Sequence, residues 1–474
     1  MDYLIKAKDA IEQAVFERLN NLFSINVRLT FYDITSTYFH SDRCPLVAHG
    51  YSRDKRPELP QIVIGVLTSY EGYPLKHFVF DGNTSDGSTV AEVVRTLKAQ
   101  FNIEQTTFVG DRGMISKLNL DCLEEESFDY IMGVKHRQDQ MLPMVIEDAQ
   151  LFAGTYIEWR GLKIVDRRVD VADFLRWKSA RILGLPKTAQ QGPAWQQFAA
   201  FIDSLDSAKT IVSATAVTHC AALGCDDRKT AAKVTALLRN YHDRCDDSVR
   251  LVCALNAASA TTAAARRNEK LDALAAQLDT ILDGASDGRE LRMERIFDGH
   301  RRRFRRFFNW QHKGEGKDQT VVSYTRDQAA LTTEAHYDGV FVLSTSRLDL
   351  PAEKVVESYK NLQEVETLFD DLKHFVDIRP VRHWLGQRVR SHVFLCILAL
   401  LLKRVYEIDC LQSKAVTESL ASVAESKLVR YRVRMSPRSD HTRTFWKVTT
   451  PSAKQSACFA AAGVRNPQSL EPYA

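Results

Sequence analysis

The sequence predicts an α/β protein in which a mixed sheet flanked by helices is interrupted by a large mixed α/β insertion. Three strand-like segments follow one another near the N-terminus, and helices and strands alternate after them. An opening meander followed by such alternation is typical of a mixed sheet with helices packed on it. From about residue 140 to 345 the alternation gives way to long helical patterns. This change predicts the insertion, which ends before a last core helix.

Composition sets the class of protein. The 474 residues are 45% hydrophobic and 26% charged, which is ordinary for a globular protein with two or three cores. The net charge of +4 permits contact with a polyanion without requiring it. The longest apolar run, Val393 to Leu402, is about half a membrane span. No secretory leader is recognisable, so we expect a cytoplasmic protein without a membrane partner.

The nine cysteines are scattered and show no disulfide-framework spacing. We interpret them as reduced thiols. One group has spacings that a zinc ribbon could use, but it lacks tight CxxC pairs, so buried free cysteines are favoured. Its members are Cys220, Cys225, His242 and Cys245.

The N-terminal elements follow from periodicity. Residues 2 to 23 have the spacing of an amphipathic helix. From Val27 the residues alternate as in a strand, and the inward row ends at Asp33. The loop from His49 to Pro60 is rich in proline and charge, and we expect its Arg53, Lys55 and Arg56 to be solvated and able to meet DNA. Strands at 62–67 and 76–80 form a hairpin.

The next four elements alternate. Thr89, with Glu92 three residues on, predicts a capping box at the start of a helix. A short apolar strand over 106–110 ends at Asp111, and Arg112 beside it could grip a phosphate or pair with an acid. A helix over 116–123 and a strand over 130–134 follow.

The insertion contains strand patterns at 156–165 and 320–324 and helical patterns at 229–241 and 261–282. Inside it, a basic stretch from His300 to Lys317 is interleaved with aromatic residues. Arginines suit phosphates and aromatic rings suit base stacking. A solvated basic edge with its aromatic rings in the core is equally compatible. The arginines concerned are Arg301, Arg302, Arg303, Arg305 and Arg306.

After a strand at 339–344, one helix is expected from Glu353 to Phe375. On a helical wheel, Glu366 falls on the apolar side. A lone carboxylate buried there would be costly, so we expect a cation to compensate it. Pairing with Lys373, two turns on, is the alternative, but that spacing exceeds the usual contact.

A second basic cluster follows this helix, and we expect its Arg379 and Arg382 to contact DNA. A helix spans 387–406. Residues 416 to 474 are polar, with strand-like alternation at 428–434. No phosphate-cradling glycine motif occurs, so no nucleotide cofactor is expected.

Two aspartates at strand ends and one glutamate on a helix form a candidate set of three carboxylates: Asp33, Asp111 and Glu366. Hard divalent cations prefer such oxygens, and Mg²⁺ binds through few carboxylates while keeping waters and substrate phosphates. Two Mg²⁺ or Mn²⁺ ions held there could support in-line phosphoryl transfer. An aspartate at a strand end is weak evidence by itself, since turns use aspartate freely.

Several stretches carry a family resemblance: YDITSTYF, GYSRDKRPELPQ, FDGNTSD, VGDRGM and IRPVRHW. They resemble the DDE transposases of the IS4-type superfamily, and most closely the IS1634 group of bacterial insertion sequences. The group's signature Tyr-x2-Arg-x3-Glu-x6-Lys falls on Tyr359, Leu362, Glu366 and Lys373. Leu362 stands in the arginine position, where it cannot make a charge-assisted bond to phosphate.

The resemblance implies an RNase H-like core with Asp33, Asp111 and Glu366 as the metal-binding triad. It also implies that Tyr359 and Lys373 contact double-stranded DNA at transposon ends, that two copies pair on DNA, and that the protein works in the bacterial nucleoid. The expected division is an N-terminal helix (1–26), core (27–138), insertion (139–335), core with the catalytic helix (336–410) and a C-terminal appendage (411–474).

Three functions are compatible with these patterns. The first is a transposase that cuts and joins DNA, and the second is a nuclease that cuts but cannot join. The third is a truncated, catalytically weak or silent DNA-binding remnant, because members of the group usually carry a longer region before the first strand. About two dozen residues precede that strand here.

Overall fold

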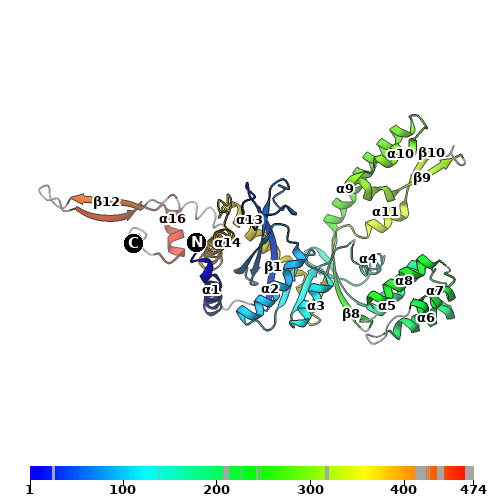
Figure 1. Cartoon of the computed structure of the whole chain (residues 1–474), viewed down its shortest axis with the longest axis horizontal. Helices are drawn as coiled ribbons and strands as arrows, with labels where there is room; N and C mark the ends of the chain where they lie inside the picture. The colour runs from blue at the N-terminus through cyan, green and yellow to red at the C-terminus, as the bar shows by residue number, and fades with distance from the viewer. Residues whose placement is uncertain are drawn as a thin grey trace. The chain divides into compact units, whose positions relative to one another are not determined.

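The computed structural model divides the chain into two compact units, residues 1–128 with 360–474, and residues 129–359 (Figure 1). The structure describes residues 1–23, 27–136, 138–205, 213–225, 227–241, 244–245, 247–314, 320–411, 423, 425, 428–434 and 442–464. Among these residues, no helix combines the length and apolar composition needed to cross a membrane.

The first unit contains four sheet strands in the order β3-β2-β1-β4. β1 pairs antiparallel with β2, β2 pairs antiparallel with β3, and β1 pairs parallel with β4. This arrangement confirms the predicted meander and the mixed sheet. The bounds are β1 (Leu29–Tyr38), β2 (Gln61–Thr68), β3 (Pro74–Asp81) and β4 (Thr107–Gly110).

Helices accompany this sheet, as the α/β class requires. α1 packs on β3, α13 on β1 and α14 on β3. The bounds are η1 (Ile5–Ala7), α1 (Lys8–Phe23), α2 (Asp86–Phe101), α3 (Lys117–Glu125), α13 (Gln363–His374), α14 (Gly386–Val405), the π-helical η6 (Tyr406–Leu411) and α16 (Ala453–Ala461). The predicted C-terminal strand is β12 (Leu428–Arg434), paired with β13 (Thr442–Val448).

The start of α2 differs from the prediction. The helix begins at Asp86 after Ser85, and the capping box predicted at Thr89 and Glu92 is wrong. Thr89 lies a turn inside the helix, where its hydroxyl donates a hydrogen bond to the Asp86 carbonyl at 2.8 Å. The apolar stripe was predicted correctly and includes Val90, Val93, Val94 and Leu97 among the buried residues.

The second unit has five antiparallel sheet strands in the order β5-β11-β8-β7-β6. They are β5 (Asp129–Gly133), β6 (Ile157–Trp159), β7 (Leu162–Asp170), β8 (Ser248–Asn256) and β11 (Val340–Thr345). The single strand predicted at 156–165 is two strands, because Arg160 and Gly161 adopt positive φ values of 47° and 75° and turn the chain. β8 was not predicted.

The remaining elements of this unit form two groups (Figure 1). One contains α5 (Val171–Leu183), α6 (Pro193–Asp203), α7 (Ser213–Ala222) and α8 (Arg228–Tyr241). The other contains α9 (Ala257–Leu282), α10 (Arg289–Arg295), η4 (Gly299–Phe307), β9 (Phe308–Lys313), β10 (Thr320–Arg326) and α11 (Gln328–Ala335). Two further helices are α4 (Leu142–Ile146) and α12 (Ala352–Lys360), and a short turn is η2 (Ala189–Gln191).

Of the cysteines with zinc-like spacing, Cys220 and Cys245 are buried, and burial raises the pKa of Cys220 to about 11. His242 lies outside the described residues.

The helix predicted over 353–375 is two helices. α12 ends at Lys360 and α13 begins at Gln363, with a turn between them. Side chains after the turn therefore point in different directions from those that a single continuous helix would give them.

A buried ionic network anchors α13 to α14. Lys403, of which 3% of the side chain is exposed, donates to Asp371 at 2.8 Å and also pairs with Glu407. Arg404 donates to Glu407 at 2.9 Å and to Glu364 at 3.2 Å. Two carboxylates of α13 are thus held by two cations of α14, which fixes how α13 lies in the first unit.

We expect Lys403→Met to destabilise the protein by about 3–5 kcal/mol, because it leaves buried carboxylates without one of their cations. The matched control is Lys98→Met, which removes an ion pair to Glu126 from a side chain that is 43% exposed. That change should cost less than about 1 kcal/mol. Urea unfolding of both variants measures the difference, and equal small losses would contradict the anchoring role.

Candidate functional site

Asp33 lies in the middle of β1, so its predicted place at a strand end is wrong, whereas Asp111 directly follows β4 as predicted. β1 and β4 pair in parallel from Leu29 opposite Thr107 to Tyr32 opposite Gly110. One residue further along the same register, Asp33 comes opposite Asp111. Adjacent strands are about 4.8 Å apart, and positions in register present their side chains on the same face. Asp111 begins a tight turn, in which the Met114 amide donates to its carbonyl at 2.9 Å.

Glu366 comes from α13, which packs against β1. The predicted burial of Glu366 is wrong, because its side chain is exposed. The turn before α13 shifts the helical phase, so the buried face consists of Val365, Leu368, Phe369 and Leu372. Glu366 lies beside that face. It is therefore exposed to solvent, without the desolvation cost that the continuous wheel predicted, and its negative charge acts on Asp33.

The charges of Asp111 and Glu366 both act on the Asp33 carboxyl. Burial, and to a lesser extent the negative charges of Asp111 and Glu366, raise the pKa of Asp33 from 3.8 to about 7. The Ile34 amide, which donates to Asp33 at 2.8 Å, and the Arg53 guanidinium oppose this rise in pKa. Negative charge is therefore concentrated around Asp33, and a cation would relieve it.

An arginine and an aspartate complete the surroundings, and neither was predicted as part of this site. Arg53 donates to Asp86 at 2.6 Å, and its amide donates to the Ser36 hydroxyl at 3.0 Å. Asp86 abuts the turn after Asp111, since a Cβ at Gly113 would lie 2.8 Å from an Asp86 carboxylate oxygen. Arg53 was expected in a solvated loop, but it is half-buried because Asp86 and Ser36 hold it.

A second ionic group holds two predicted DNA contacts. Lys373 donates to Asp54 at 2.8 Å, and Arg379 lies 3.3 Å from the other Asp54 oxygen. The Asp54 side chain is 7% exposed. Arg379 also lies over the Tyr38 ring, 5.1 Å from its centroid. A buried carboxylate thus occupies the position between two cations that a phosphate could take.

The other predicted DNA contacts are spread over the chain. Arg112 is exposed in the turn after β4, and Arg382 is exposed in the segment before α14. Tyr359 belongs to the second unit, where its half-buried ring lies 6.4 Å from that of Phe341. The structure does not bring these residues together in one unit.

The basic and aromatic stretch separates into two parts. Phe304, Phe307 and Phe308 are buried in a cluster with leucines of α9, so these rings are not available for base stacking. Arg301, Arg302, Arg303 and Arg306 are exposed, whereas Arg305 is half-buried and pairs with Glu294 at 2.6 Å. Of the two interpretations, the structure favours the basic surface with its aromatic rings in the core.

The chemistry of the three side chains fits a hard divalent cation, since Asp33, Asp111 and Glu366 all supply carboxylate oxygens and the raised pKa of Asp33 shows a local excess of negative charge. Among the described residues, no three His, Cys, Asp or Glu side chains are already gathered closely enough to ligate one ion. Magnesium sites commonly use one or two carboxylates with waters and substrate phosphates, so a ready-made cage of three is not required.

Comparison with known proteins gives little. No protein-family profile and no curated protein matches the chain. Among solved structures, a chain of the piggyBac transposase synaptic complex with hairpin DNA aligns at 13% identity, over 49% of this chain and 53% of that one. The present chain thus spans about half the length of that transposase. The TM-score is 0.22, which is too low to support an argument about fold or function.

Asp33→Asn should stabilise the metal-free protein at about pH 8 by roughly 1–3 kcal/mol. The pKa of Asp33 is raised from 3.8 to about 7 in the folded chain. The stability that its protonated form contributes is therefore complete below pH 3.8 and is lost as the pH rises through about 7. Near pH 5 the gain should be smaller. Thermal unfolding in EDTA at both pH values measures it. Asp42→Asn, at an exposed carboxyl, is the control. A gain in stability of Asp33→Asn that does not depend on pH would contradict the raised pKa of Asp33.

Proposed function

We propose that the protein is a DNA transposase that cleaves and joins strands at insertion-sequence ends by a metal-dependent DDE mechanism. The observation that carries the proposal is the placement of three acids from distant stretches of the chain: Asp33 in β1, Asp111 directly after β4, which pairs with β1, and Glu366 on α13, which packs on β1. The charges of the last two act on Asp33. We also propose that the chain belongs to the IS1634 group of the IS4-type superfamily, because the stretches around Asp33, Asp111 and Glu366 resemble those of the group. Two copies of the chain would act together on double-stranded DNA in a bacterial nucleoid.

The strand arrangement supports the proposal. An RNase H-like core was expected from the family resemblance, and the first unit has an antiparallel meander followed by a parallel strand. The third acid comes from a helix packed on the first strand. Asp33 and Glu366 come from the rigid elements β1 and α13, and Asp111 directly follows β4, which suits a site that must hold a defined geometry.

In this proposal Asp33, Asp111 and Glu366 would hold two Mg²⁺ or Mn²⁺ ions. Bound there, the ions would supply Lewis-acid activation of the attacking oxygen and stabilisation of the leaving oxygen. Arg53, held by Asp86, offsets part of the negative charge beside Asp33. Lys373 would bind a phosphate of the DNA backbone near the carboxylates.

The alternative is a catalytically weak or silent DNA-binding remnant. Two observations favour it: Glu366 is exposed, and Leu362 replaces the arginine of the signature with a buried apolar side chain. A nuclease that cannot join strands is the third possibility. Cleavage of a labelled end duplex with Mg²⁺ or Mn²⁺ separates the remnant from the two enzymes, and joined product in a target plasmid separates those two from each other.

Glu366→Gln should abolish cleavage of the labelled duplex while leaving DNA affinity within about twofold. The change removes one charge from the carboxylate group but keeps the size of the side chain. Asp370→Asn is the matched control, because Asp370 lies on the same helix, is exposed and pairs with His374. Gel analysis of products and fluorescence anisotropy of binding measure the two effects.

Full cleavage by Glu366→Gln would show that the third acid is misassigned. Loss of cleavage in Asp370→Asn with activity retained in Glu366→Gln would move the assignment to Asp370. Loss of both cleavage and binding in Glu366→Gln would indicate a structural role instead.

Lys373→Gln should weaken DNA binding about uniformly over sequences and reduce the magnitude of the salt slope by about one. Asp54→Asn should do the opposite, since it removes the negative charge that holds Lys373 and Arg379. Anisotropy titrations over a series of salt concentrations measure both slopes. Unchanged slopes in both variants would exclude Lys373 as a phosphate contact.

A further inference from the structure

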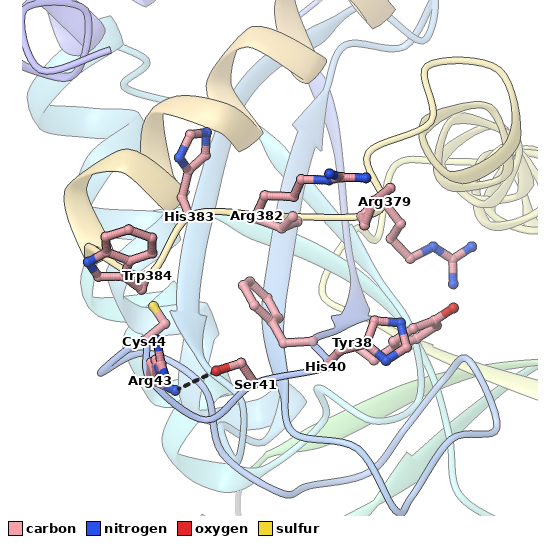
Figure 2. A pocket seen from close by; sticks show the side chains of 12 residues that line it. Tyr38, His40, Ser41, Arg43, Cys44, Arg379, Arg382, His383 and Trp384 are labelled. Atoms are coloured by element: carbon pink, nitrogen blue, oxygen red, sulfur yellow. Dashed lines mark hydrogen bonds between the residues drawn. The ribbon is translucent and has the colours of Figure 1, made fainter.

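A cavity of about 800 Å³ lies in the first unit, between two short segments (Figure 2). One segment runs from Tyr38, the last residue of β1, to Cys44. The other runs from Arg379 to Trp384, in the connection between α13 and α14. The volume falls within the range of about 300–1,000 Å³ that small ligands occupy. The cavity thus has room for one nucleotide but not for a duplex.

The lining is basic. Arg43, Arg379 and Arg382 line the cavity, and among the described residues no aspartate or glutamate does. Arg379 forms an ion pair with Asp54 at 3.3 Å. Arg43 and Arg382 are exposed, and within the described part of the chain neither forms an ion pair. Two guanidinium groups at one cavity without a protein carboxylate favour an anionic ligand, and their planar forks suit a phosphate.

The lining also offers aromatic surface. Trp384 is 60% exposed, although an indole of this size is usually well buried. The Tyr38 and His40 rings meet edge to face on the opposite segment, 5.5 Å apart, and Figure 2 shows Trp384 across the cavity from them. An exposed indole is a good stacking surface for a nucleobase. In the 300–310 stretch, by contrast, the phenylalanine rings are buried in the core.

We propose that this cavity binds one unpaired nucleotide of a DNA strand, with its base against Trp384 and the phosphates of the strand attracted by Arg43 and Arg382. The inference rests on the proposed function and names a further contact for the same DNA. Tyr38 follows Asp33 by five residues on β1, which is about 17 Å at the rise of a strand. The bound nucleotide therefore lies several nucleotides from the phosphate at the carboxylates.

The test compares three probes in EDTA, so that no cleavage occurs: a single-stranded oligonucleotide of about 16 nucleotides, the blunt duplex of the same sequence, and free thymidine monophosphate. The full chain is titrated as wild type, Trp384→Ala and Arg382→Gln. Tyr3→Ala and Lys6→Gln are the matched controls, since Tyr3 is 87% exposed and Lys6 is an exposed cation elsewhere in the same unit.

Trp384→Ala should weaken binding of the single strand about tenfold, as the loss of one base stack does. Arg382→Gln should weaken it about fivefold at low salt. The duplex should change by less than about twofold in both variants, and the control variants should behave as wild type. This difference between probes is the signature of an unpaired nucleotide in the cavity.

Equal losses on the duplex and the single strand would overturn the inference, because the residues would then form a general DNA surface. No loss on either probe would also overturn it. Binding of thymidine monophosphate as tight as that of the oligonucleotide, and lost in Trp384→Ala, would assign the cavity to free nucleotides instead of DNA. The carboxylate proposal is tested separately by cleavage, so a protein that binds the single strand but never cuts would refute that proposal alone.

Discussion

The parallel pairing of β1 with β4 is the constraint on which the candidate site depends. Its register brings Asp33 opposite Asp111, and a slip of one residue would turn either side chain to the other face. β2, buried along its whole length on the other side of β1, holds this register against change. This arrangement has an energetic cost, because burial and the acidic neighbours of Asp33 raise its pKa to about 7. Such a cost is typical of functional sites and is offset when a cation binds.

The third acid depends on ionic contacts as well as on packing. α13 buries its apolar face against the unit, and its Glu364 and Asp371 are held by Arg404 and Lys403. Buried ion pairs add little net stability, but they penalise any other orientation of the helix. Lys373 is held in the same way by Asp54. The helix that carries Glu366 is therefore placed by charges on either side of it.

Two basic and aromatic stretches end up in different roles. In the 300–310 stretch the rings fill a core with leucines of α9, and the arginines cover its surface. In the 379–384 stretch the chain runs between two helices, and Trp384 remains exposed beside arginines. Composition is similar in the two cases. The difference is that leucines of α9 pack on the rings of the first stretch, and composition does not reveal which neighbour a segment will have.

The sequence by itself determined the order of strands and helices in the first unit, the stripe of α2, and the place of Asp111 directly after a short apolar strand. These are local properties, set by periodicity and turn residues. Asp33 was expected at a strand end, but β1 continues past it to Tyr38. The tertiary structure decided the exposure of Glu366, the capture of Lys373 by Asp54 and the pairing of Arg53 with Asp86. Each of these joins segments far apart in the chain or depends on one turn that shifts a helix in phase, so periodicity along the sequence could not reveal them.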